Sequence, residues 1–431
     1  MKKSSLLIAF LFSYLLLAAN ETMQESSSPQ ESLSYEKLLE REIVADRVNA
    51  EATLSKPYVV MVSLDGFRHD YAERYGAKNI LSLKANGSCV RRLIPSFPSK
   101  TFPNHYTIAT GLYPAHHGIV SNYFYSRERD EIYKLGDRAA VEDGTWYGGV
   151  PIWVLAEQQG MLSASFFWVG SEADVKGIHP TYYFPFDSKV PYELRVRKIL
   201  DWLKLPESKR PHMLTLYYSL TDSIGHHYGP ISPEMKEAVL EVDGLIGKLR
   251  EGLEASGLPV TLIVTSDHGM TEVSNININD YVDLKDNWFA GGPVAMIYTK
   301  DDAETQRLYD ELSKTDRFDT YYGNALPAYL NYHNADRVGD LVISAKAPDC
   351  IERWTEEEPL SYSIKGAHGF DPYTHPDMGG IFYIQGPDIR TGVELAPIEN
   401  IHIYPLLAHL LNLEMTEPVD GQFDVLAPVL K

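Results

Sequence analysis

Three apolar, β-branched runs of this chain each stop at an acidic residue, and this repetition constrains the fold more than any other feature. The runs are residues 58–64, 213–220 and 260–266, and the acids that follow them are Asp65, Asp222 and Asp267. Near-continuous apolar runs of this length are typical of strands buried on both faces, as in parallel sheets. Helical patterns lie between them, as over residues 233–255. The alternation predicts an α/β sandwich with a mostly parallel central sheet flanked by helices.

The pattern changes after Asp267. Residues 293–299 predict a strand, residues 303–313 a helix, and residues 328–332 and 340–345 two further strand-like pieces. We interpret this stretch as a small α+β insertion at about residues 290–350. The main sheet is expected to resume near Gly366 and to end with a strand at residues 380–386. One catalytic domain would then cover residues 57–431.

The N-terminus has the composition of a targeting segment. Two lysines precede an apolar run over residues 6–17, which ends in Ala18 and Ala19. This pattern predicts a signal peptide over residues 1–19 and export, with the bacterial periplasm as the expected compartment. The alternative is a retained membrane anchor, for which the run is short, and no other segment is apolar enough to span a membrane. Residues 20–56, rich in Glu and Ser, are expected to form a leader with a short amphipathic helix.

The acidic charge limits the partners of the protein. The formal net charge is −20, and loss of the two lysines with the signal peptide would make it −22. A surface this acidic repels a phosphate backbone, so stable nucleic-acid binding is not expected. We expect a monomer that acts on a small molecule, with a local cationic site to attract an anion. For Cys89 and Cys350 we favour two buried thiols, with a disulfide as the alternative in an exported protein.

The three strand-end carboxylates are candidate metal ligands. The carboxyl ends of parallel strands meet at one edge of a sheet, where open α/β folds bind their ligands. A single aspartate at such a position could simply cap the next helix, but histidines accompany two of the three. His226 follows Asp222 by four residues, so both side chains lie on one side of a helical turn. The adjacent His227 could substitute, but it would face elsewhere on a helix.

His268 directly follows Asp267, and neighbours on a strand point to opposite faces. The two can share a metal only if the strand has already ended, which Gly269 supports. His368 stands in a glycine-flanked loop, where backbone can approach a site closely. Aspartate and histidine ligands without cysteine suit zinc. The other histidines are interpreted as structural: His69, His105, His116, His117, His179, His212, His333, His375, His402 and His409.

Thr101 is the candidate nucleophile. Apolar residues at helical spacing follow it, and Pro103 suits the first turn of a helix. We therefore expect Thr101 just before a helix N-terminus, where free backbone N–H groups attract a phosphoryl oxyanion. A threonine hydroxyl is a weak nucleophile, and zinc coordination can lower its pKa. The alternative is that Thr101 only caps the helix.

Four segments of the chain carry a family resemblance: residues 63–68 (SLDGFR), 97–105 (FPSKTFPNH), 266–270 (SDHGM) and 365–371 (KGAHGFD). In this order they resemble the nucleotide pyrophosphatase/phosphodiesterase family, a branch of the alkaline phosphatase superfamily. The similarity covers roughly residues 57–430. The resemblance implies an alkaline phosphatase-like sandwich and two zinc ions per chain. It also implies hydrolysis of phosphodiester and pyrophosphate bonds of nucleotides, with release of nucleoside 5′-monophosphates through a covalent phosphothreonine intermediate.

The resemblance also implies a set of metal ligands. One zinc would be held by Asp222, His226 and His368, and the other by Asp65, Thr101, Asp267 and His268. No metal or nucleophile position departs from the family pattern.

Substrate contacts follow from the same resemblance. Asn122 matches a family asparagine that donates to a phosphoryl oxygen. Phe102 and Tyr183 fall where the family holds a nucleobase between two aromatic rings, and Trp168 would line the same pocket. The stretch over residues 130–147 matches no known subgroup.

Rival functions exist on the same fold. A choline-phosphodiester or lysophospholipid hydrolase is one, and a phosphomonoesterase or sulfatase is another. Sulfatases use a modified Cys or Ser where this chain has Thr101, and no arginine for a phosphate dianion accompanies the Thr101 motif. A metal-free binding relic is the non-enzymatic alternative, and the intact set of ligand residues argues against it.

Overall fold

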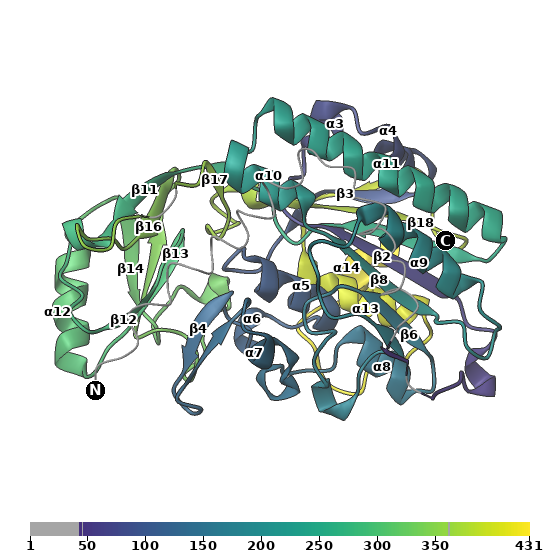
Figure 1. The fold of residues 1–431 in the computed structure, drawn as a ribbon, viewed down its shortest axis with the longest axis horizontal. Helices are drawn as coiled ribbons and strands as arrows, with labels where there is room; N and C mark the ends of the chain where they lie inside the picture. Colours follow the sequence, from purple (N-terminus) through teal and green to yellow (C-terminus); the bar gives the residue numbers. More distant parts are fainter. Residues whose placement is uncertain (1–42, 45, 361–362) are drawn as a thin grey trace.

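A mixed ten-stranded sheet forms the centre of the computed structural model, which describes residues 43–44, 46–360 and 363–431 (Figure 1). Its strands are β1 (Ile43–Val44), β2 (Tyr58–Leu64), β3 (Ser88–Ile94), β6 (Ser163–Phe166), β7 (Tyr182–Tyr183), β8 (Met213–Tyr218), β9 (Val260–Thr265), β18 (Gly380–Gln385), β19 (Val393–Leu395) and β20 (Ile398–Glu399). The order is β1-β7-β6-β8-β2-β9-β18-β3-β19, and β20 also pairs with β3. All neighbours from β7 to β9 are parallel, whereas β18 is antiparallel to both of its neighbours. The mostly parallel sheet is confirmed, and the three predicted strands lie side by side as β8-β2-β9.

Helices cover both faces of the sheet (Figure 1). One layer holds α3 (Tyr71–Tyr75), α4 (Lys78–Asn86), α9 (Tyr192–Leu203), α10 (Leu220–Tyr228) and α11 (Pro233–Ser256). The other holds α5 (Thr101–Thr110), α6 (Pro114–His117), α7 (Arg138–Glu142), α8 (Ile152–Gln158), α13 (Ile403–Leu410) and α14 (Phe423–Leu426). Strand β2 feeds both cores, because Val60 and Val62 pack toward the first layer and Val59 and Met61 toward the second. This two-sided burial explains the continuous apolar run in the sequence.

A smaller region leaves the main sheet after β9 and returns through β17 (Figure 1, green). An antiparallel pair closes it, formed by β10 (Thr271–Glu272) and β17 (Gly366–Ala367). Inside it lie β11 (Ser274–Asn277), β12 (Trp288–Ala290), β13 (Val294–Tyr298), α12 (Asp302–Leu312), β14 (Phe318–Tyr322), β15 (Leu341–Ala345) and β16 (Asp349–Glu352). These elements are α+β, as expected, but they extend beyond the predicted range of 290–350 on both sides.

One strand predicted within this smaller region is wrong. Residues 328–332 do not pair with another strand, and Ala328–Leu330 form a 3₁₀ helix instead. Pro327 precedes this turn, and Asn331 ends it in the left-handed region at φ 47°. A left-handed residue reverses the chain, so the apolar run cannot continue as an extended strand.

The expected signal peptide over residues 1–19 and most of the expected leader lie outside the described residues. The described part of the leader belongs to the main fold, because Ile43 pairs with Tyr183 at the edge of the sheet. The Asn49 side chain also donates to the carbonyl oxygens of Glu207 (2.8 Å) and Arg210 (2.7 Å). The folded unit therefore begins before residue 57, earlier than the sequence suggested.

Both cysteines are free and buried, which confirms the interpretation of Cys89 and Cys350 as separate thiols. Across the part of the chain that the structure describes, none of the helices is both long enough and apolar enough to cross a membrane.

The buried parallel strands predict a large stability loss on truncation. Leu216 lies on β8 with no exposed surface, so Leu216→Ala is expected to lower the free energy of unfolding by about 2–5 kcal/mol in urea denaturation. Leu240 on α11 is 40% exposed, and Leu240→Ala is the matched control, with an expected change within about 0.5 kcal/mol. Similar losses in the two variants would contradict this assignment of the core.

Candidate active site

The ends of three adjacent parallel strands bring the three aspartates together. Asp65 directly follows β2, Asp222 lies in the first turn of α10 after β8, and Asp267 follows β9. Gly66 allows this close approach, because its φ is +66° and a Cβ there would lie 2.9 Å from the Cα of Asp222. The Gly66 N–H also donates to Oδ1 of Asp267 at 3.2 Å. The predicted meeting of strand-end carboxylates is confirmed.

Asp222, His226 and His368 form one ligand set. Oδ1 of Asp222 lies 3.3 Å from Nε2 of His226 and 3.5 Å from Nε2 of His368. Ligand atoms of these three residues lie within 4.8 Å of one another. Helix α10 places Asp222 and His226 on one side, as their spacing predicted, while the ring of His227 packs against Tyr228 instead.

The second ligand set consists of Asp65, Thr101, Asp267 and His268, and its polar atoms gather around one imidazole nitrogen. Nε2 of His268 lies 2.9 Å from Oδ2 of Asp267, 3.4 Å from Oδ1 of Asp65 and 3.2 Å from Oγ1 of Thr101. Strand β9 ends at Thr265, before Asp267 and His268, so the two neighbours can face the same side. The four residues predicted for this site therefore lie together.

Backbone carbonyl groups orient the three histidines. Nδ1 lies 2.8 Å from the Gly366 oxygen in His226, 2.8 Å from the Gly269 oxygen in His268 and 2.9 Å from the Ser99 oxygen in His368. A carbonyl oxygen only accepts hydrogen bonds, so each Nδ1 carries a hydrogen and each Nε2 faces the carboxylates. This arrangement is typical of metal-binding histidines, whose other ring nitrogen is held by a hydrogen bond.

The carboxylates offer buried oxygens with no protein partner. Oδ1 of Asp65, Oδ1 of Asp222 and Oδ2 of Asp267 are buried and accept no well-directed hydrogen bond from any described residue. Buried polar atoms of this kind call for a bound group, and oxygen and imidazole donors suit a divalent cation. The residues present therefore fit a metal centre.

The pKa shifts of the three aspartates also favour a bound cation. Burial, with the neighbouring Asp267 and Asp222 carboxylates, raises the pKa of Asp65 well above its usual range. Burial also opposes ionisation of Asp222, but His226, together with His368 and His268, outweighs it and lowers the pKa of Asp222 to about 2. Likewise, His268 and His105 outweigh burial and hold the pKa of Asp267 well below its usual range. Bound cations would relieve the repulsion that raises the pKa of Asp65.

Thr101 begins helix α5 rather than capping it. The N-cap residue is Lys100, and the Thr101 hydroxyl points to His268 as described above. Asn122 lies beside it, because Oδ1 of Asn122 accepts a hydrogen bond from the Phe102 N–H at 2.9 Å. The NH₂ group of Asn122 remains as the donor end of that amide.

The expected aromatic contacts differ in their exposure. Phe102 is partly buried, and the ring of Tyr183 stacks on His179 with centroids 4.6 Å apart and a 5° tilt. Trp168 is only 3% exposed, and its indole N–H donates to the His105 carbonyl oxygen at 3.0 Å. The roles of Phe102, Tyr183 and Trp168 as substrate contacts stay predictions.

Two polar residues at the site were missed as functional groups. The Tyr217 hydroxyl donates to Oδ2 of Asp65 at 2.5 Å, and Nδ1 of His105 lies 3.3 Å from Oδ2 of Asp267. Tyr217 lies within the apolar run of β8, so nothing in the sequence pattern distinguished it from an ordinary core residue. His105 follows Thr101 by four residues in α5, and this helical spacing was a usable signal.

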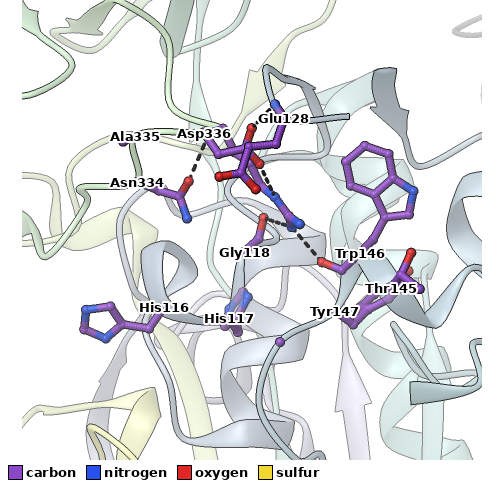
Figure 2. A pocket seen from close by; sticks show the side chains of 12 residues that line it. His116, His117, Gly118, Glu128, Thr145, Trp146, Tyr147, Asn334, Ala335 and Asp336 are labelled. Atoms are coloured by element: carbon purple, nitrogen blue, oxygen red, sulfur yellow. Dashed lines mark hydrogen bonds and ion pairs between the residues drawn. The ribbon is translucent and has the colours of Figure 1, made fainter. Parts of the chain in front are cut away.

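A cavity of about 440 Å³ lies apart from these ligands (Figure 2). Its lining residues are His116, His117, Gly118, Glu128, Thr145, Trp146, Tyr147, Gly148, Asn334, Ala335, Asp336 and Arg337. The Arg337 guanidinium donates to the Gly118 and Trp146 carbonyl oxygens and pairs with Asp336. Its Nε and Nη1 donors are therefore used within the protein, and the lining of the cavity includes no predicted site residue.

The fold is that of the alkaline phosphatase-like α/β class. A sequence profile described as type I phosphodiesterase / nucleotide pyrophosphatase matches residues 59–371. The chain belongs to this family of metal-dependent hydrolases.

Relatives of known name and structure agree. The chain is 36% identical over 397 residues to human ectonucleotide pyrophosphatase/phosphodiesterase family member 1, covering 88% of this chain and 42% of the relative. A Schizosaccharomyces pombe pyrophosphatase/phosphodiesterase is 34% identical over 409 residues, covering 90% and 83%. The structure of an inactive variant of murine ectonucleotide pyrophosphatase/phosphodiesterase 5 in complex with AMP aligns with a TM-score of 0.82 and 31% identity, covering 87% and 100%. The chain thus spans less than half the length of the human relative.

The crowded carboxylates predict stabilisation by metal. Zinc at a hundred times its dissociation constant would add about 2.7 kcal/mol per site to the free energy of unfolding. Dialysis against a chelator is therefore expected to lower Tm, and zinc should restore it. Asp222→Asn should lose part of this response. His116→Ala, at an exposed contact with Asp420, should keep all of it. A Tm that ignores both chelator and zinc would contradict a metal centre.

Proposed function

We propose that this protein is a two-zinc phosphodiesterase that cleaves phosphodiester and pyrophosphate bonds of nucleotides and releases nucleoside 5′-monophosphates. The observation that carries the proposal is the Thr101 hydroxyl, which lies 3.2 Å from Nε2 of His268 within a cluster of unpartnered carboxylate oxygens. The names of the relatives support the activity, and the AMP complex of the murine relative supports a nucleotide product.

Each ligand set would hold one ion. Asp222, His226 and His368 form the first, and Asp65, Thr101, Asp267 and His268 the second. When bound, the two zinc ions would supply positive charge for the attacking and leaving oxygens of an in-line displacement.

The chain's own groups then position the reaction. Oγ1 of Thr101 attacks phosphorus, the bond from phosphorus to the leaving oxygen breaks, and the proton of the Thr101 hydroxyl passes through solvent to the leaving group. The NH₂ group of Asn122 donates to a phosphoryl oxygen, and the N-terminus of α5 favours the developing negative charge. In the second step, water attacks phosphorus, the bond to Oγ1 breaks and Thr101 regains its proton. The intermediate is a phosphothreonine diester.

A diester suits the site better than a monoester. A phosphate dianion needs additional cationic side chains, and Lys100 is the cation beside the nucleophile. Its ammonium group lies 3.3 Å from the Val294 oxygen and 3.5 Å from Oγ of Ser121, so it is already engaged. A choline-phosphodiester hydrolase remains the second candidate. A product assay on ATP, dinucleotides and glycerophosphocholine separates it from a nucleotide enzyme.

Export is part of the proposal. The relatives include ectonucleotide enzymes and venom phosphodiesterases, whose names support a location outside the cytosol. They are animal and yeast proteins, so they lend no support to the bacterial periplasm expected from the sequence.

The role of Thr101 can be tested directly. If it is the nucleophile, Thr101→Ala should lower turnover of a nucleotide diester by several orders of magnitude while the protein stays folded, because Oγ1 is the attacking atom. Thr101→Ser should retain part of the rate, since its hydroxyl occupies a similar position. Rapid quenching with a labelled diester should yield a phosphorylated peptide that contains Thr101. An active Thr101→Ala enzyme, or a label on another residue, would overturn the mechanism.

The aromatic residues should set base recognition. If Phe102 and Tyr183 hold a nucleobase, changing either to Ala should cost roughly 1–3 kcal/mol of binding, measured through kcat/KM on nucleotide diesters. Phe423, which lies in α14 with its ring tilted against that of His409, provides a control: Phe423→Ala should not change the base preference. Minimal p-nitrophenyl diesters lack a base and should be little affected. Equal losses on both kinds of substrate would argue against stacking.

A further inference from the structure

His105 is a fully buried histidine between the nucleophile and a metal ligand. Its Nδ1 lies 3.0 Å from the carbonyl oxygen of Thr101 and 3.3 Å from Oδ2 of Asp267. Its Nε2 lies 2.8 Å from Oγ of Ser63, which stands two residues before Asp65 on β2. One ring thus touches α5, the end of β9 and β2, which carry the nucleophile and two of the predicted ligands.

The hydrogen-bond partners of the His105 ring determine which of its two nitrogens carries the hydrogen. A carbonyl oxygen and an ionised carboxylate can only accept, so Nδ1 carries the hydrogen. Nε2 is then the acceptor of the Ser63 hydroxyl. In this tautomer Nδ1–H of His105 is hydrogen-bonded to the Thr101 carbonyl oxygen and lies 3.3 Å from Oδ2 of Asp267, an oxygen that accepts no well-directed hydrogen bond from any described residue.

Packing holds the ring in this orientation. Trp168 and Tyr217 each meet it edge-on, with ring centroids 5.2 Å away. The Trp168 indole N–H donates to the His105 carbonyl oxygen, so the residue is fixed at its backbone as well. Rotation of the imidazole would break the contacts to Ser63, Thr101 and Asp267 together.

We propose that His105 is a positioning residue, which couples the place of the Thr101 backbone to the orientation of Asp267 and so tunes metal affinity at the second ligand set. This inference rests on the proposed two-zinc function. Both ring nitrogens of His105 contact protein groups, so neither is left to bind substrate. Its effect is therefore expected on zinc binding and on kcat, with KM close to that of the unchanged enzyme.

The test compares two buried histidines. His105→Phe keeps a flat ring against Trp168 and Tyr217 but removes both nitrogens. His117→Phe is the matched control, because His117 is equally buried and bonds to the Thr107 hydroxyl (3.0 Å) and the Pro103 carbonyl (3.2 Å) of the same helix, without touching a predicted ligand. Ser63→Ala removes only the hydroxyl that donates to Nε2 of His105, and it serves if His105→Phe does not fold.

Each apoprotein is titrated with zinc in competition with a chromogenic chelator, alone and in an Asp222→Asn background that isolates the second set. His105→Phe is expected to weaken zinc binding at that set by roughly 10–100-fold, with a smaller loss in the same direction for Ser63→Ala and none for His117→Phe. Unchanged affinity in His105→Phe and in Ser63→Ala, or an equal loss in His117→Phe, would overturn the positioning role. Failure of the unchanged protein to bind two ions would instead overturn the proposed function.

Discussion

The mutual repulsion of three crowded carboxylates is the constraint around which this structure is arranged. Asp65, Asp222 and Asp267 are brought together by three neighbouring parallel strands, and the burial of Asp65 and Asp267 disfavours their charged forms. Three imidazole rings lie beside these carboxylates, and a backbone carbonyl oxygen holds each ring through its Nδ1. The Tyr217 hydroxyl donates to Asp65. The same grouping accounts for the fit to divalent cations and for the position of Thr101.

The sequence was informative wherever a local pattern and a site residue coincide. Continuous apolar runs marked β2, β8 and β9, and the acid at the end of each run marked the functional edge of the sheet. The four-residue spacing of Asp222 and His226 gave their shared helix face. These predictions rest on strand burial and helical periodicity, which a single sequence carries.

Other features depend on contacts between distant segments, which no local pattern carries. The antiparallel direction of β18 is set by its place between β9 and β3. The edge-on packing of Trp168 against His105 is another such contact. Tyr217 looks like an ordinary core residue in the sequence, and only the tertiary arrangement shows that it meets a carboxylate of the site.

The short ladder between β10 and β17 has a consequence for the geometry of the site. It begins three residues after His268 and ends one residue before His368, and the rings of these two histidines stack with centroids 3.5 Å apart. The backbone pairing at the base of the smaller region therefore helps to set the distance between the two rings. A change of register in this two-residue ladder would move one imidazole relative to the other, so the spacing of the two halves of the site depends on a pairing of only four residues.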